Sequence, residues 1–173
     1  MQYLGIDLGG TNIAAGVVND AYHVVGRKSV PTPGDVTGEI LSDTMAQLVR
    51  DLLEEQGLVL RDLPWVGIGA PGYIDSRLGV NRFAGNLCGG LTDDPMAANL
   101  ENRLGVKTYL VNDANAAAYG ESVAGAARGA ASSLTVTLGT GVGGGIILEG
   151  TGGFVVGEVG HMIIRQGGED CTC

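Results

Sequence analysis

The sequence predicts a mixed α/β fold, in which strands and helices pack as layers around a sheet. Three strand-like segments open the chain, and a long helical pattern follows them. Later, short strands alternate with helices before a final pair of strands. The expected order is therefore β-β-β-α-β-α-β-α-β-β, a mixed layer that begins with a meander.

The first strands are indicated by alternation of apolar residues. Residues 2–9 (QYLGIDLG) alternate, and strand-like stretches recur at 14–20 and 22–30 with an Asn-Asp turn between them. We therefore expect an antiparallel meander of three strands. After the break PTPGD, apolar residues recur at helical spacing and predict a helix that stops near Gly57. They are Ile40, Leu41, Met45, Leu48, Val49, Leu52 and Leu53.

The middle of the chain alternates short strands with helices. Residues 65–72 (WVGIGAPG) predict a buried strand that runs into a glycine-proline turn. Asp94 is expected as the N-cap of a compact helix, with Pro95 at its first position and Gly105 after its end. Residues 107–127 indicate a strand, a polar junction and an alanine-rich helix.

Residues 133–150 predict two strands joined by a glycine-rich turn, after a shift in composition at ARGAASS. We expect a first domain at 1–128 and an incomplete second domain at 129–173. The glycine-rich stretches near Asp7 and Gly139 each follow a strand, which points to an old duplication.

The composition is that of a folded, acidic chain. It has 173 residues, 45% of them hydrophobic, a mean hydropathy of +0.21, a net charge of −9 and a pI of about 4.5. Such a surface repels nucleic acid and anionic membranes, so neither is an expected partner. The three cysteines form no disulfide framework, and the amino end has no signal peptide, so a reduced, cytoplasmic location is expected.

The stretch DLGGT combines features of an anion site. Gly9 and Gly10 let backbone N–H groups converge, Thr11 adds a hydroxyl donor, and Asp7 is a hard ligand for Mg²⁺. The alternative is an ordinary hairpin with a glycine turn.

The stretch TLGTGVGGG (137–145) contains the pattern G-x-G-x-x-G from Gly139 to Gly144. A dinucleotide-binding fingerprint requires a helix after this pattern, whereas here a strand follows. The remaining readings are a phosphate-binding turn and a purely structural turn.

Asn112 and Asp113 stand where a strand meets a helix. A carboxylate there can act as a base toward a substrate hydroxyl, or it can simply cap the helix. Further along, His161, Cys171 and Cys173 carry the nitrogen and sulfur ligands that zinc favours. The alternative for these three is a histidine in a turn and a frayed cysteine tail.

Together, DLGGTN, GIGAPGYID, Asn86–Leu87, VNDANAAA, TLGTGVGGG and GEVGHM followed by CTC resemble the motifs of ROK-type sugar kinases, in the same order. The resemblance covers the whole chain. It implies the actin-like ATPase (ribonuclease-H-like) fold, with a complete N-terminal domain and the start of a second. It also implies ATP-dependent phosphorylation of a hexose hydroxyl, glucose to glucose 6-phosphate by default, by a cytoplasmic homodimer.

The resemblance also implies roles for individual residues. Asp113 resembles the catalytic base, and it joins Asn86, Asn112, Glu158 and His161 around the sugar. A structural Zn²⁺ would be held by His161, Cys171 and Cys173. The residues that resemble ligands of ATP with Mg²⁺ are Asp7, Gly9, Gly10, Thr11, Gly139, Thr140, Gly141 and Gly143.

In the family the zinc motif continues beyond its first two cysteines. We therefore expect a fragment of a longer kinase. The alternatives are a fragment of a ROK-type sugar-responsive transcriptional regulator, or a non-catalytic truncated remnant.

Overall fold

The computed structural model describes residues 1–34, 37–85, 87, 89–139, 141–150, 154–155 and 157–169. The chain forms two compact units, Met1–Asp113 and Ala114–Cys173. The alanine-rich helix thus groups with the second unit. The domain boundary expected after residue 128 stays a prediction.

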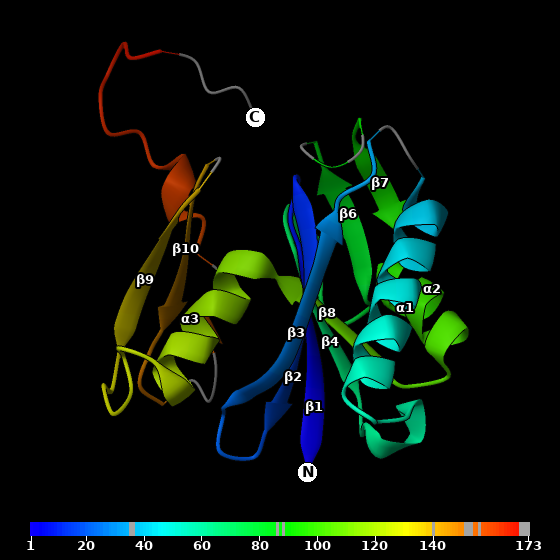
Figure 1. Cartoon of the computed structure of the whole chain (residues 1–173). Helices are drawn as coiled ribbons and strands as arrows, with labels where there is room; N and C mark the ends of the chain where they lie inside the picture. The colour runs from blue at the N-terminus through cyan, green and yellow to red at the C-terminus, as the bar shows by residue number, and fades with distance from the viewer. Residues whose placement is uncertain are drawn as a thin grey trace. The chain divides into compact units, whose positions relative to one another are not determined.

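A five-stranded sheet forms the centre of the first unit (Figure 1). Its strand order is β3-β2-β1-β4-β8. β1 pairs with β2, and β2 with β3, in antiparallel fashion, which confirms the predicted meander. β1, β4 and β8 run parallel, so their carboxyl ends meet at one edge of the sheet. The strands are β1 Gln2–Leu8, β2 Asn12–Asn19, β3 Val24–Pro31, β4 Val66–Ala70 and β8 Thr108–Asn112.

Two helices, α1 (Gly38–Glu55) and α2 (Met96–Leu104), cover one face of this sheet (Figure 1). Apolar residues at alternate positions of β1 are buried beneath them, together with the apolar side of α1. Arg103 of α2 forms ion pairs with Glu39 and Asp43 of α1, which joins the two helices at their exposed side. α1 ends at Glu55, and Gly57 follows with a φ of 65°, as the sequence predicted. The short helix η1 (Leu60–Asp62) then leads into β4.

A second, three-stranded sheet in this unit was not predicted. It consists of β5 (Tyr73–Asp75), β6 (Val80–Ala84) and β7 (Leu91–Asp94), in the order β5-β6-β7. The expected N-cap role of Asp94 is wrong, because Asp94 ends β7 and Pro95 is the N-cap of α2, without a capping bond from its side chain. The Asp94 carboxylate instead accepts a hydrogen bond from the Asn99 amide, 3.5 Å away. Gly105 does end the helix, with a φ of 67°.

The second unit pairs a helix with a small antiparallel sheet. Its elements are α3 (Asp113–Ala124), β9 (Ser133–Leu138), β10 (Val142–Ile147), β11 (Phe154–Val155) and the short helix η2 (Val159–His161), and the sheet order is β11-β10-β9. The predicted pair of strands with a glycine-rich turn is confirmed as β9 and β10. β11 was not predicted.

Glycines in β10 allow α3 and η2 to approach closely. A Cβ on Gly145 would lie 2.5 Å from the Cβ of Ala118, and a Cβ on Gly144 would lie 2.1 Å from a methyl of Val159. α3 and η2 therefore pack on opposite faces of β10, because successive residues of a strand point to opposite faces.

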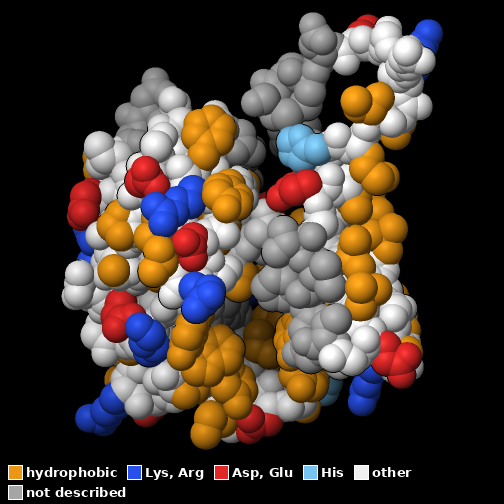
Figure 2. Space-filling model, turned by 180° about the vertical axis from the view of Figure 1, so that it is seen from behind, with side chains coloured by type: hydrophobic (Ala, Val, Ile, Leu, Met, Phe, Trp, Pro, Cys, Tyr) orange, Lys and Arg blue, Asp and Glu red, His pale blue; other side chains and the backbone are white. Residues whose placement is uncertain are grey.

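Apolar residues of β9 are exposed. The exposed fractions are 59% for Leu134, 50% for Val136 and 81% for Leu138. Figure 2 shows hydrophobic side chains gathered in a row on this part of the surface. Among the described residues, no helix has both the length and the apolar character needed to cross a membrane.

Candidate functional site

The carboxyl edge of the parallel strands gathers the polar residues that the sequence analysis singled out in the first unit. Asp7 lies opposite Gly69 in the pairing of β1 with β4, and Ala70 lies opposite Asn112 in the pairing of β4 with β8. Asp113 follows as the first residue of α3. Asp7 and the Asn112–Asp113 pair thus flank the end of β4.

Asp7 and Asp113 form a pair of interacting carboxylates. Partial burial raises the pKa of Asp7, and the negative charge of Asp113 raises this pKa further. Two neighbouring carboxylates are stabilised by a divalent cation, and hard cations prefer oxygen ligands. The donor set at this edge therefore fits Mg²⁺.

The turn from β1 to β2 is fixed by backbone contacts. Gly9 donates a hydrogen bond from its N–H to the carbonyl of Asn12 at 3.0 Å, and a Cβ on Gly9 would lie 2.9 Å from the same oxygen. The Thr32 hydroxyl donates to the Gly9 carbonyl at 2.6 Å, and the Thr32 N–H donates to the Thr11 carbonyl at 2.9 Å. Gly10 and Thr11 stay exposed, so a rigid turn presents them to solvent beside Asp7.

Asn112 makes a contact that the sequence did not indicate. Its side-chain amide donates to the carbonyl of Gly72, 3.4 Å away, in the turn after β4. Asn81 donates to the preceding carbonyl of that turn, Pro71, at 3.1 Å. The sequence analysis missed Asn81, because it lies in the short stretch VNRFA, which polar residues interrupt and which carries no motif.

In the second unit, the predicted phosphate turn lies between β9 and β10. Gly139 donates from its N–H to the carbonyl of Gly141 at 2.9 Å. Gly143 has a packing reason to be glycine, since its Cβ would lie 2.7 Å from the Thr137 hydroxyl and 3.1 Å from the Cβ of Ala114. Its predicted role toward phosphate stays a prediction.

Glu158 and His161 lie next to each other at η2. The imidazole Nε2 of His161 is 3.7 Å from a carboxylate oxygen of Glu158, and both side chains are exposed. Asn86, Thr140, Cys171 and Cys173, also predicted as site residues, lie outside the described residues. Within the described part of the chain, no group of three or more His, Cys, Asp or Glu side chains is placed to hold a metal ion.

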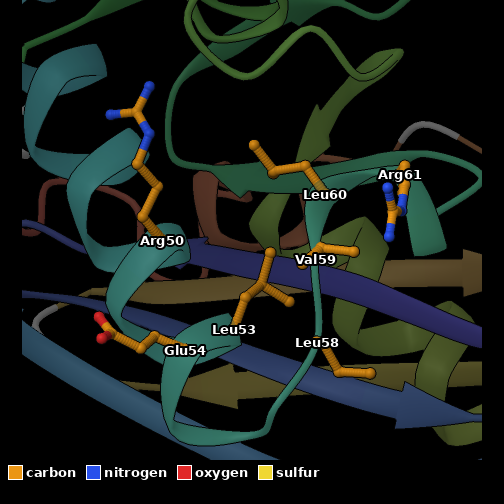
Figure 3. Close-up of a pocket in the computed structure, with 7 residues that line it drawn as sticks. All are labelled: Arg50, Leu53, Glu54, Leu58, Val59, Leu60 and Arg61. Carbon is orange, nitrogen blue, oxygen red and sulfur yellow. The ribbon is translucent and has the colours of Figure 1, made fainter.

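A surface pocket of about 580 Å³ lies elsewhere in the first unit (Figure 3). Arg50, Leu53 and Glu54 line it from the end of α1, and Leu58, Val59, Leu60 and Arg61 line it from the segment before β4. That segment precedes β4, whereas Asp7 and Asn112 lie at the carboxyl ends of the parallel strands. The pocket is therefore separate from the candidate site.

Comparison with known proteins gives a consistent set of relatives. The sequence profile of the ROK family matches residues 3–173. A glucokinase of Halalkalibacterium halodurans is 37% identical over 99% of this chain and 53% of its own length. An N-acetylmannosamine kinase of Salmonella arizonae is 34% identical over all of this chain and 58% of its own length. The chain thus spans about half the length of the curated relatives it matches.

Solved structures show the same similarity. A ROK family glucokinase from Streptomyces griseus, solved in complex with glucose and AMPPNP, superposes with a TM-score of 0.83 at 38% identity. The match covers 95% of this chain and 51% of that one.

Proposed function

Because the chain belongs to the ROK family, we propose that it forms part of an ATP-dependent hexose kinase that converts glucose to glucose 6-phosphate. The fold is the actin-like ATPase fold of the ROK kinases, as the sequence predicted. The glucokinase relatives, and the structure with glucose and AMPPNP, favour glucose over other hexoses. The N-acetylmannosamine kinase of Salmonella arizonae is 34% identical to this chain, against 37% for the glucokinase of Halalkalibacterium halodurans.

The proposal rests on two carboxylates, Asp7 and Asp113, that interact electrostatically at the carboxyl edge of the sheet. Phosphoryl transfer from ATP depends on positioning and on neutralising charge, with a carboxylate near the attacking hydroxyl. In our proposal Asp113 accepts the proton of the sugar hydroxyl. Asp7 holds Mg²⁺, which would neutralise charge on the phosphates of bound ATP.

The backbone turns would hold the phosphates. The fixed, exposed turn at Gly9–Thr11 offers N–H groups and a hydroxyl to an anion beside Asp7. The turn from Gly139 to Gly143, with Thr140, is proposed to supply a second set of donors. Such local donors let an acidic chain bind a charged phosphate.

The sugar would be bound by Asn86, Asn112, Glu158 and His161, together with Asp113. The amide of Asn112 is held at the edge of the sheet, immediately before the proposed base. The exposed carboxylate of Glu158 and the imidazole of His161, side by side, offer an acceptor and a donor for sugar hydroxyls.

The proposal also includes a structural Zn²⁺. The imidazole of His161 lies beside the carboxylate of Glu158, and a neighbouring carboxylate commonly orients a histidine that binds a metal. Cys171 and Cys173 would add thiolates, and a further ligand would be needed for tetrahedral zinc. A homodimer in the cytoplasm completes the proposal.

The test is a coupled assay of glucose 6-phosphate formation by the protein made from the complete reading frame, with ATP and Mg²⁺. Turnover that depends on all three, and is lost in Asp113→Asn, would support the proposal. Binding of glucose without turnover would point instead to a sugar-responsive regulator. Absence of both binding and turnover would leave a non-catalytic remnant.

A further inference from the structure

Asn81 is a buried amide in the middle strand of the β5-β6-β7 sheet. Its exposed fraction is 0%, and its neighbours in register are Ile74 on β5 and Asp94 on β7. Its Oδ1 has no hydrogen-bond partner among the described residues. A buried polar atom without a partner lowers the stability of the folded protein. We therefore look for a role of Asn81 other than stabilising the sheet.

The other end of this amide holds the turn after β4. The Nδ2 of Asn81 donates to the Pro71 carbonyl at 3.1 Å. The next residue, Gly72, has a φ of 99°, and a Cβ there would lie 2.2 Å from the Phe83 carbonyl and 2.9 Å from the Cβ of Ala84. The turn is thus pressed against β6, and its geometry admits only glycine at position 72.

Asn112 binds the same turn from β8. Its Nδ2 donates to the Gly72 carbonyl at 3.4 Å, and Asp113 is the next residue in the chain. Two amides from two different sheets therefore hold two successive carbonyls of one turn. A displacement of the turn at Pro71 would be transmitted to Asn112 and from there to Asp113.

From this geometry we propose that Asn81 is a positioning residue for sugar phosphorylation, which fixes the Pro71–Gly72 turn and thereby the Asn112 amide and the Asp113 carboxylate. The inference rests on the proposed kinase function. Asn81 itself touches neither substrate, because its side chain is buried beneath the turn.

The first test is Asn81→Leu, which keeps the branch at Cγ and removes the donor but adds volume. One buried oxygen lacks a partner in each form, Oδ1 of Asn81 in the natural protein and the Pro71 carbonyl in the variant. The melting temperature should therefore fall only through the tighter packing of the larger leucine, and kcat is compared at a temperature at which both proteins are fully folded. By contrast, kcat for glucose should fall about 10- to 100-fold, since small displacements at a reacting group are costly, while the KM for ATP stays unchanged.

The second test is Asn81→Asp, whose carboxyl group donates to Pro71 only when protonated. Burial raises the pKa of a carboxyl at this position, because the charged form loses its hydration. The ratio of kcat for the variant to kcat for the natural protein should fall as the pH rises from 6 to 9. A role limited to filling space predicts a ratio that does not vary with pH.

Val49→Ala is the matched control, because Val49 is fully buried but lies in α1, outside the β5-β6-β7 sheet and the Pro71–Gly72 turn. It should lower the melting temperature and leave kcat unchanged. Natural kcat in Asn81→Leu, or a loss that merely follows a lowered melting temperature, would overturn the inference.

An NMR readout separates this inference from the proposed function. In Asn81→Leu, the side-chain amide of Asn112 and the backbone amide of Asp113 should shift, whereas in Val49→Ala they should not. Unshifted resonances would show that Asn81 does not position Asn112 and Asp113 through the Pro71–Gly72 turn. Shifted resonances in a protein without turnover would instead refute the kinase function.

Discussion

Asp7 and Asp113 flank the end of β4, and the pKa of Asp7 is raised by burial and then by the charge of Asp113. Asp7 lies in β1 and Asp113 directly follows β8, and these two strands, distant in the chain, are both neighbours of β4. The relationship arises because β1, β4 and β8 run parallel and end at the same edge. It places the proposed Mg²⁺ ligand next to the proposed base.

Asp113→Asn should lower kcat by about 10²- to 10⁴-fold, the usual contribution of a general base, with a much smaller change in the KM for glucose. The same change removes a negative charge beside Asp7, so the pKa of Asp7 should fall toward its usual range. Kinetics and an NMR titration of the Asp7 carboxyl check the two effects. An unchanged pKa of Asp7 would show that the two carboxylates do not interact.

Asp7→Asn should make the protein more stable at neutral pH while it weakens binding of Mg²⁺ and ATP. The pKa of Asp7 is raised in the folded state, so the folded protein binds this proton more tightly than the unfolded chain. Stability therefore falls as the pH rises from the unfolded pKa through the folded one. The substitution removes this loss, and its benefit should be small because the side chain is buried only in part and solvent screens its charge.

Melting temperatures at pH 3 and pH 7 test this sign. The difference between Asp7→Asn and the natural protein should be present at pH 7 and vanish at pH 3, where both states are protonated. A difference of the same size at both pH values would assign the effect to packing.

Periodicity predicted the elements that carry a strong local pattern. The meander, α1 and the β9–β10 pair each have regular alternation or helical spacing, and all three are present. The β5-β6-β7 sheet was missed because its strands are short and polar residues interrupt them, so their pairing depends on tertiary contacts. Asp94 was misassigned for a related reason, since strand pairing with β6 competes with helix capping.

At the candidate site, the sequence predicted roles for single residues but not which residues they contact. Asp7 and Asp113 each carried a recognisable motif, whereas their interaction depends on strand order. The hydrogen bonds from Asn81 and Asn112 to one turn also join segments that are distant in the chain. No local pattern contains such information.

Gly145→Ala should destabilise the second unit by about 1–3 kcal/mol, the usual effect of overpacking. Its new methyl would lie 2.5 Å from the Cβ of Ala118 and 2.8 Å from the Ala114 carbonyl, which forces α3 away from β10. Gly120→Ala is the matched control in α3 itself, where a Cβ meets nothing within 4 Å. This control should stabilise the helix by about 0.5–1 kcal/mol. Hydrogen exchange of the β9 and β10 amides measures the stability change caused by each substitution. Equal changes in the two variants would contradict the packing argument.

The strands β1 and β9 share a pattern of alternating apolar residues, but in the described part of the chain only the apolar residues of β1 are covered by other parts of the protein. Leu4, Ile6 and Leu8 of β1 are buried, whereas Leu134, Val136 and Leu138 of β9 repeat the same spacing and are exposed. In the 173-residue chain, Ile6→Ala should cost about 2–5 kcal/mol of unfolding free energy, since it leaves a cavity in the core. Val136→Ala should cost less than about 1 kcal/mol, the range of strand propensity alone.

Denaturant unfolding of the two variants at several protein concentrations checks this contrast. If Val136→Ala costs as much as Ile6→Ala, the apolar face of β9 is covered in solution. A cost that grows with protein concentration would identify the cover as a second copy of the chain, because only association makes stability depend on concentration. A cost that is independent of concentration would place the cover within the chain itself.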